Sequence, residues 1–307
     1  MPTTTDDPLP GLIRTLRSRT ATERIRASKD LGRLGSLARD ALPTLVGLLR
    51  DDDAKVREAA AQAVGQMGTT ALPALSGMLA HSDKYVRRNA IWAMSRLGVQ
   101  AKPALTSLCR GLKDLDPRTA SGAAQALGNM GEDAAEAIPA LTEAMRGTNI
   151  VLCRLAAKAL SQIGAPAVSS LIDHLQHTDP FVRGEAALAI GWIGPAARAA
   201  LPHLAQLVRG KQSRSLRDTP APGGSLDRLL QASSKQTGSS GSLTPVSSSS
   251  TEGTTPEETC RVYAAQALGR MGTDAAGAVA ELRIAARTGG EALRQAAQQA
   301  LRLIQES

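Results

Sequence analysis

One phrase recurs along the chain at a nearly constant spacing, and this repetition constrains the fold more than any other feature. Its clearest copies are DDAKVREAAAQAVGQMG from Asp52, SDKYVRRNAIWAMSRLG from Ser82 and TDPFVRGEAALAIGWIG from Thr178. The glycines that close six successive copies are spaced 33, 30, 33, 33 and 30 residues apart: Gly35, Gly68, Gly98, Gly131, Gly164 and Gly194. Weaker copies begin near Glu258 and Glu291. A period of this length is typical of a solenoid built from two-helix units.

A second phrase follows each glycine, as in ALPTLVGLLR from Ala41, and the opening PLPGLIRTLR is the same phrase without a preceding partner. Both phrases are predicted helices, because apolar residues such as Val56, Ala60 and Val64 recur at helical spacing. A closing glycine suits a helix end and a proline suits the first turn of the next helix. Four starts are preceded by an aspartate that can cap them: Asp53, Asp83, Asp116 and Asp179. Two turn lengths, differing by three residues, explain the 30 and 33 spacings. Apolar and polar residues do not alternate at the two-residue period of a strand, so no sheet is predicted.

The pattern D-x-x-V-R-x-x-A-A-x-A-L-G-x-[ILM]-G followed by A-[LI]-P-x-L-x-x-L resembles HEAT repeats, especially the subtype first described in phycobilisome lyases. The resemblance covers nearly the whole chain except about residues 210–256. It implies an all-α fold, a right-handed α-solenoid of about eight antiparallel helix pairs. It also implies that the helix of the V-R phrase lines the concave face. For function the resemblance is weak, since one architecture serves many roles.

The repeats are interrupted inside the seventh pair, which divides the chain into residues 1–209, 210–257 and 258–307. The middle part is rich in Ser, Thr, Gly and Pro and poor in apolar residues, so we expect a disordered insertion. It is either a tolerated flexible loop or a functional segment. In the second case SLDRLLQA docks on the concave face or recruits a partner, or the serine runs are phosphorylated.

The helical wheel predicts three exposed rows on the concave helices, at the positions of Glu58, Gln62 and Gln66. Seven positions in these rows are basic and one is acidic, against 36 basic and 28 acidic residues in the chain. Both tryptophans fall in the rows. We therefore predict a contact strip for a protein partner, acidic or extended: Lys29, Arg33, Tyr85, Arg88, Trp92, Arg96, Arg154, Lys158, Trp192 and Arg270. The alternative is that the tryptophans pack between adjacent repeats.

The arginines of the V-R phrase are interpreted as structural. Together with the aspartate that precedes each of them, they suit a ladder of ion pairs between repeats and of helix caps: Asp53 and Arg57, Asp83 and Arg87, Asp179 and Arg183. Ala120 and Cys153 occupy the arginine position in the fourth and fifth repeats, so the ladder is broken there.

Catalysis is not expected. Deoxyhypusine hydroxylases of similar repeats hold iron with His-Glu dipeptides, whereas the four histidines here are followed by Ser82, Leu175, Thr178 and Leu204. His174 and His177 form a polar helix end rather than a metal site. No motif marks a bilin site of a phycobilin lyase, and no acid lies beside the tryptophans as in a HEAT-like DNA glycosylase. We expect no cofactor and no metal. Two alternatives remain: a phycobilin-lyase-like or deoxyhypusine-hydroxylase-like enzyme, which only the family resemblance implies, and a nucleic-acid-binding protein.

The remaining expectations come from composition. The formal net charge of +8 indicates an acidic partner, or only an organism's preference for arginine. Three widely spaced cysteines without a CxxC pair favour a reducing compartment. The N-terminus lacks signal-peptide character, and no apolar run approaches the roughly 18 residues of a membrane span. We expect a cytoplasmic monomer that does not enter a membrane.

Overall fold

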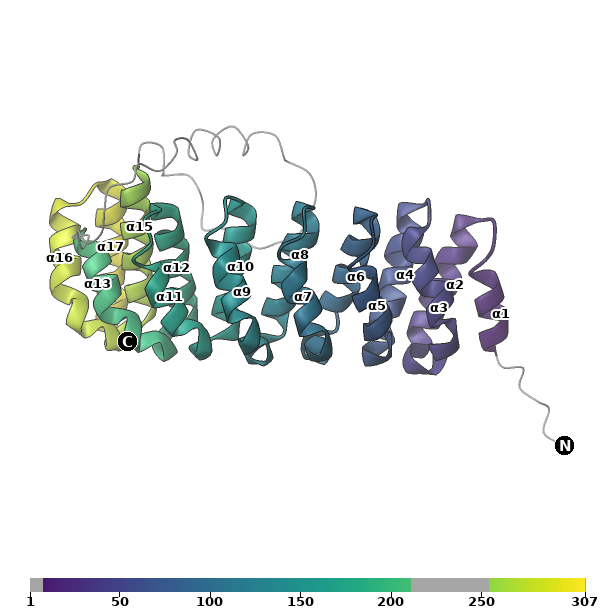
Figure 1. Cartoon of the computed structure of the whole chain (residues 1–307). Helices are drawn as coiled ribbons and strands as arrows, with labels where there is room; N and C mark the ends of the chain where they lie inside the picture. The colour runs from purple at the N-terminus through teal and green to yellow at the C-terminus, as the bar shows by residue number, and fades with distance from the viewer. Residues whose placement is uncertain (1–7, 211–253, 307) are drawn as a thin grey trace.

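The chain folds as a linear stack of paired helices. In a computed structural model, residues 8–210 and 254–306 are described, and this part of the chain holds sixteen α-helices and no β-strand. The helices succeed one another along one axis from α1 to α17 (Figure 1). The predicted all-α solenoid is confirmed.

The helices lie in two layers, which we name by their sequence phrases. The V-R layer contains the longer helices: α2 (Ala21–Leu34), α4 (Ala54–Gln66), α6 (Lys84–Ser95), α8 (Pro117–Asn129), α10 (Ile150–Ile163), α12 (Pro180–Ile193), α15 (Pro256–Arg270) and α17 (Glu291–Glu306). The proline layer contains α1 (Pro8–Thr15), α3 (Leu42–Gly47), α5 (Leu72–Met78), α7 (Leu105–Gly111), α9 (Ile138–Met145), α11 (Val168–His174), α13 (Leu201–Arg209) and α16 (Val279–Thr288).

Each helix of the proline layer packs against the next helix of the V-R layer, which gives eight pairs from α1–α2 to α16–α17. The seventh pair is α13–α15, and the predicted insertion falls between its two helices. Residues 211–253 of that insertion, including the SLDRLLQA segment and the serine runs, lie outside the described residues. The helix α15 begins at Pro256, so its first two residues precede the boundary predicted at residue 258.

The helix ends follow the local chemistry predicted for them. Every closing glycine adopts a positive φ, from 52° at Gly98 to 84° at Gly164, which a residue with a Cβ adopts only at a cost. A 3₁₀ turn then leads into the proline helix. The turn after Gly35 has seven residues and the turn after Gly68 has four, and this difference of three confirms the explanation of the two spacings.

The starts of the V-R helices are capped by side chains. Asp53 accepts hydrogen bonds from the backbone N–H of Lys55 and of Val56, at 2.7 and 3.3 Å. Asp83, Asp116 and Asp179 act in the same way on their own first turns. These caps take up donors that a helix start leaves unpaired.

Small residues let the V-R helices approach one another closely. A Cβ added to Gly191 of α12 would lie 2.8 Å from Cα of Ala267 in α15, and one added to Gly128 of α8 would lie 3.0 Å from Cα of Ala159 in α10. Most neighbours in the proline layer touch less. The V-R layer is therefore the more closely packed of the two layers.

Candidate partner-binding surface

The predicted contact strip is spread over five helices of the V-R layer. Lys29 and Arg33 come from α2, and Tyr85, Arg88, Trp92 and Arg96 from α6 and its end. Arg154 and Lys158 belong to α10, Trp192 to α12 and Arg270 to α15. Tyr85 and Trp192 are the two rings that reach solvent most, with 46% and 47% of their surface exposed. The structure therefore presents aromatic rings on the exposed side of the layer.

Cations lie against the rings of this surface. Arg96 lies 5.3 Å from the ring centre of Trp92, and Arg154 lies 5.4 Å from that of Phe181. Trp92 is itself partly buried against the core, so for this residue packing between repeats accounts for part of its surface. Trp192 is different, because nearly half of it is exposed. Such cation–ring contacts hold guanidinium groups in place without neutralising them.

Acidic residues from outside the three rows neutralise part of the strip. Arg33 pairs with Asp30 at 2.9 Å, Arg88 with Asp116 at 2.9 Å and Arg154 with Glu185 at 3.1 Å. The count of seven basic positions thus overstates the charge available to a partner. Within residues 8–210 and 254–306 four strip cations form no ion pair: Lys29, Arg96, Lys158 and Arg270.

Glu185 is the buried acid of this surface. Its side chain is 4% exposed, while that of its partner Arg154 is 58% exposed. Burial raises the pKa of Glu185, and the charge and hydrogen bond of Arg154 offset this only in part. Arg154 therefore stabilises the ionised form of Glu185, and a partner that competed for Arg154 would raise the pKa of Glu185 further.

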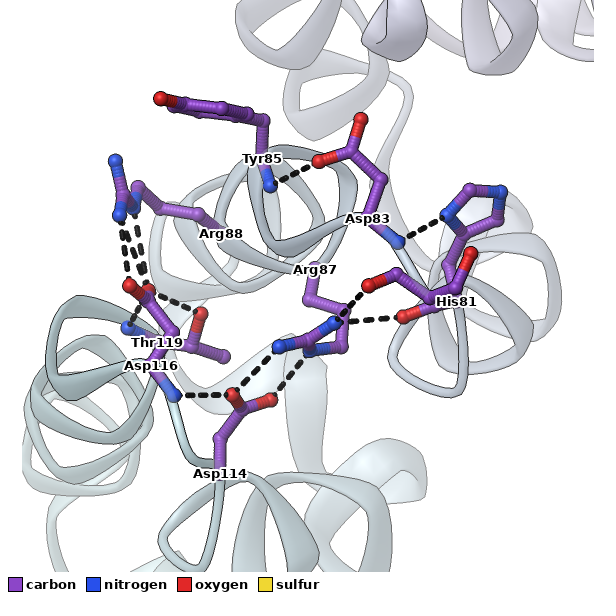
Figure 2. Close-up of polar contacts among 9 residues, drawn as sticks. His81, Asp83, Tyr85, Arg87, Arg88, Asp114, Asp116 and Thr119 are labelled. Atoms are coloured by element: carbon purple, nitrogen blue, oxygen red, sulfur yellow. Dashed lines mark hydrogen bonds and ion pairs between the residues drawn. The ribbon is translucent and has the colours of Figure 1, made fainter.

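The ladder of arginines exists, but its acids differ from those predicted. Arg87 donates from Nε and Nη2 to both oxygens of Asp114, at 2.6 and 2.9 Å, and from Nη1 to the carbonyls of His81 and Ser82 (Figure 2). Asp83, the aspartate that precedes Arg87 in the sequence, caps its own helix instead. The ion pair therefore crosses to the loop of the next repeat, 27 residues further along.

A related ion pair forms at another interface. Arg24 donates a hydrogen bond to Asp51 from Nη2 at 2.8 Å, and its Nε lies 2.7 Å from the other carboxylate oxygen without forming a hydrogen bond. Burial acts to raise the pKa of Asp51, but hydrogen bonds from Arg24 and from the backbone N–H of Asp53, with the charges of Arg24 and Arg57, outweigh it and leave the pKa lowered. Arg183 pairs with Glu257 through Nη2 alone, and its Nε has no hydrogen-bond partner among the described residues. Arg57 has no acidic partner in the described part of the chain.

The remaining chemistry-bearing residues are individually engaged or buried. His174 bonds the carbonyl of Ser170 through Nδ1 at 2.7 Å, and burial, with the neighbouring His174, lowers the pKa of His177. All three cysteines are free thiols, and burial raises the pKa of Cys153 to about 12. Across residues 8–210 and 254–306 no group of three His, Cys, Asp or Glu residues could hold a metal ion. The helices in these ranges are all too short or too polar to span a bilayer.

Comparison with known proteins agrees with the geometry. A family model described as HEAT repeats matches residues 9–95, 72–152 and 138–219. The chain belongs to the HEAT-repeat family. A comparison of this HEAT-repeat protein with curated proteins gives no match.

The solved structures that this chain matches include three chains of low sequence identity. An engineered protein is 20% identical with a TM-score of 0.41, covering 97% of this chain and 88% of that one. A computationally designed armadillo repeat protein for modular peptide recognition is 21% identical with a TM-score of 0.39, covering 60% and 99%. Human deoxyhypusine hydroxylase in complex with glycerol is 19% identical with a TM-score of 0.37, covering 97% and 96%. These values concern the fold alone.

Proposed function

We propose that this HEAT-repeat protein is a non-catalytic scaffold that binds an extended, acidic segment of a partner protein along the V-R layer. The observation that supports it most is the exposure of Tyr85 and Trp192 on a surface that also carries the unpaired cations Arg96, Lys158 and Arg270. Aromatic and arginine side chains often dominate binding energy at interfaces. Spread along the V-R layer from α6 to α15, they suit a long segment rather than a compact ligand.

The same proposal places the protein in the cytoplasm as a monomer without a cofactor. Support for a reducing compartment comes from the three free thiols. Support for a non-catalytic role comes from the sequence, in which no histidine is followed by a glutamate. Acidic groups interrupt the strip at Arg33, Arg88 and Arg154, so a protein segment fits it better than a continuous phosphate backbone.

The test is affinity capture with the full chain and with a variant carrying both Arg96→Ala and Trp192→Ala. Both side chains are exposed, so their removal should leave the helical content unchanged. We expect the variant to lose partners that the parent captures. The matched control is Arg110→Ala on α7, an exposed arginine of the proline layer, which should capture the same partners as the parent. Equal capture by all three proteins would refute the proposal.

A salt titration then separates a protein partner from nucleic acid. Binding through phosphate contacts weakens steeply and linearly on a logarithmic salt scale, because neutralised phosphates release counterions. We expect weak binding of random-sequence DNA at physiological salt. If the protein binds DNA tightly and Arg96→Ala weakens this binding, the partner is nucleic acid and the proposed protein partner is wrong.

A further inference from the structure

Arg57 has an empty guanidinium fork. Its Nη1 donates to the carbonyls of Asp51 and Asp52, at 2.6 and 3.0 Å, just as Arg87 and Arg24 bond the carbonyls of their own loops. In Arg57 the Nε and Nη2 nitrogens, through which Arg87 donates to a carboxylate, have no hydrogen-bond acceptor in the described part of the chain. This fork geometry matches the spacing of two oxygens in a carboxylate or a phosphate.

The reason is a histidine in the position of the missing acid. Asp51, His81 and Asp114 occupy equivalent positions in three successive loops, and each accepts the backbone N–H two residues further on, at 3.0, 3.0 and 2.8 Å. Figure 2 shows His81 in this position, at the start of the loop that leads into α6. Asp51 and Asp114 also receive the arginine of the preceding repeat, whereas His81 offers Arg57 no carboxylate.

Two further cations share the ring that Arg57 contacts. The guanidinium of Arg57, the ammonium of Lys84 and the guanidinium of Arg88 lie 5.5, 5.4 and 5.3 Å from the ring centre of Tyr85. The ring is 46% exposed. Arg88 is bound to Asp116, but Lys84 has no ion pair among the described residues. Two nearby acids are engaged elsewhere, because Asp83 caps α6 and Asp53 caps α4.

We propose that this Tyr85 cluster, formed by Arg57, Lys84, Arg88 and Tyr85, binds a phosphoryl group on a serine or threonine of the partner protein. A phosphomonoester carries close to two negative charges and three acceptor oxygens, which suits several cations grouped around one ring better than a single carboxylate does. The inference deepens the proposed function and rests on it for the identity of the partner. Nucleic acid fits less well, because along the strip the neighbouring cations Arg33 and Arg154 are already paired with acids.

The first experiment is an NMR titration of the ¹⁵N-labelled full chain with three short Gly-Ser peptides, carrying phosphoserine, glutamate or serine at the centre. We expect saturable shifts of the Tyr85 backbone amide and of Arg57 Nε with the phosphoserine peptide. Its affinity should exceed that of the glutamate and serine peptides by about tenfold or more, as expected when charged hydrogen bonds are gained. Shifts confined to other regions, or equal affinity for the three peptides, would overturn the proposal.

Two variants test the empty fork, and one serves as their control. Arg57→Gln removes it, and His81→Asp supplies the acid that fills it, so each should lower the affinity for the phosphoserine peptide about tenfold. His81→Asp should at the same time raise the unfolding temperature, so a loss of binding cannot be ascribed to misfolding. His177→Asp introduces the same residue at the equivalent position of α11–α12, where Cys153 replaces the arginine. It should leave binding unchanged, and a loss equal to that of His81→Asp would overturn the assignment.

The outcomes separate this site from the proposed function. If the phosphoserine peptide does not bind but capture still depends on Arg96 and Trp192, the Tyr85 cluster is wrong and the scaffold proposal stands. If the peptide binds while partner capture does not depend on Arg96 and Trp192, the Tyr85 cluster is supported and the contact strip is wrong. An oligothymidine that binds the cluster more tightly than the peptide would assign the site to nucleic acid and overturn the phosphoprotein proposal.

Discussion

The ion pair between Arg87 and Asp114 should stabilise the stack far more than the corresponding arginine of the preceding repeat. The two side chains are only 15% and 10% exposed, and two hydrogen bonds join them. Arg87→Ala leaves Asp114 poorly solvated with one backbone bond, from the N–H of Asp116. Hydrogen bonds to charged groups contribute about 1.5–3 kcal/mol, and breaking a largely buried pair costs about 3–5 kcal/mol. Because the pair retains some exposure, we expect a loss of about 2–4 kcal/mol.

Arg57→Ala provides the matched comparison, because Arg57 makes the two loop bonds of Arg87 without the ion pair. Its loss should be about 1 kcal/mol, the net value of ordinary hydrogen bonds. A double-mutant cycle of Arg87→Ala and Asp114→Ala should give a coupling energy of about 1.5–3 kcal/mol. The corresponding cycle of Arg57→Ala and His81→Ala should give a coupling near zero.

The measurement is urea unfolding, followed both by helical circular dichroism and by tryptophan fluorescence. A repeat array need not unfold in one step, so the two signals must coincide before free energies are extracted. Equal destabilisation by Arg87→Ala and Arg57→Ala, or a coupling in the Arg87 cycle no larger than in the Arg57 cycle, would refute the role assigned to the ion pair.

Three further results are expected. Gly128→Ala should destabilise the protein by about 1–2 kcal/mol, because the new methyl meets the backbone of Ala159. Gly77→Ala, whose methyl meets no other atom, should stabilise it by about 0.5–1 kcal/mol. The denaturant midpoints of the two variants and the parent test both changes. The pKa of Glu185 is higher in the folded than in the unfolded protein, so its ionisation lowers the stability of the fold as pH rises from near 4 through the folded pKa. Glu185→Gln should therefore gain stability relative to the parent between pH 4 and pH 7. A difference in stability that stays constant over this range would contradict the prediction. Native thiols should react slowly with a disulfide reagent at pH 8 and rapidly in urea, since burial raises the pKa of Cys153 to about 12; fast labelling of all three in the native protein would contradict this.

The local parts of the fold were predictable from single repeats. A glycine such as Gly68, an aspartate such as Asp53 and a proline such as Pro73 each act on their own helix end, so their roles follow from the residues beside them. The eight pairs and the two turn lengths then followed from spacing. The glycines that face neighbouring alanines were missed, although their recurrence three residues before most of the closing glycines was visible.

The site was less predictable, because its contacts join different repeats. The partner of Arg87 lies 27 residues away in the sequence, and an aspartate much closer to it has another role. The rows predicted which residues point outward, but acids beyond the rows, such as Asp116 and Glu185, set the charge that remains. The empty fork of Arg57 becomes visible only when equivalent loops are compared, since His81 is unremarkable by itself.

The packing of α12 against α15 also bears on how the chain may be divided. These two helices form the most extensive helix–helix contact in the described residues, with Gly191 against Ala267 and Arg183 paired with Glu257, although 43 residues outside the described ranges separate Gly210 from Thr254 in the sequence. Cohesion at this point comes from matched surfaces and does not require an unbroken backbone. Two separately produced fragments, cut between residues 210 and 254, should therefore reassemble as a heterodimer. A foreign domain inserted between the same residues should leave the stack folded.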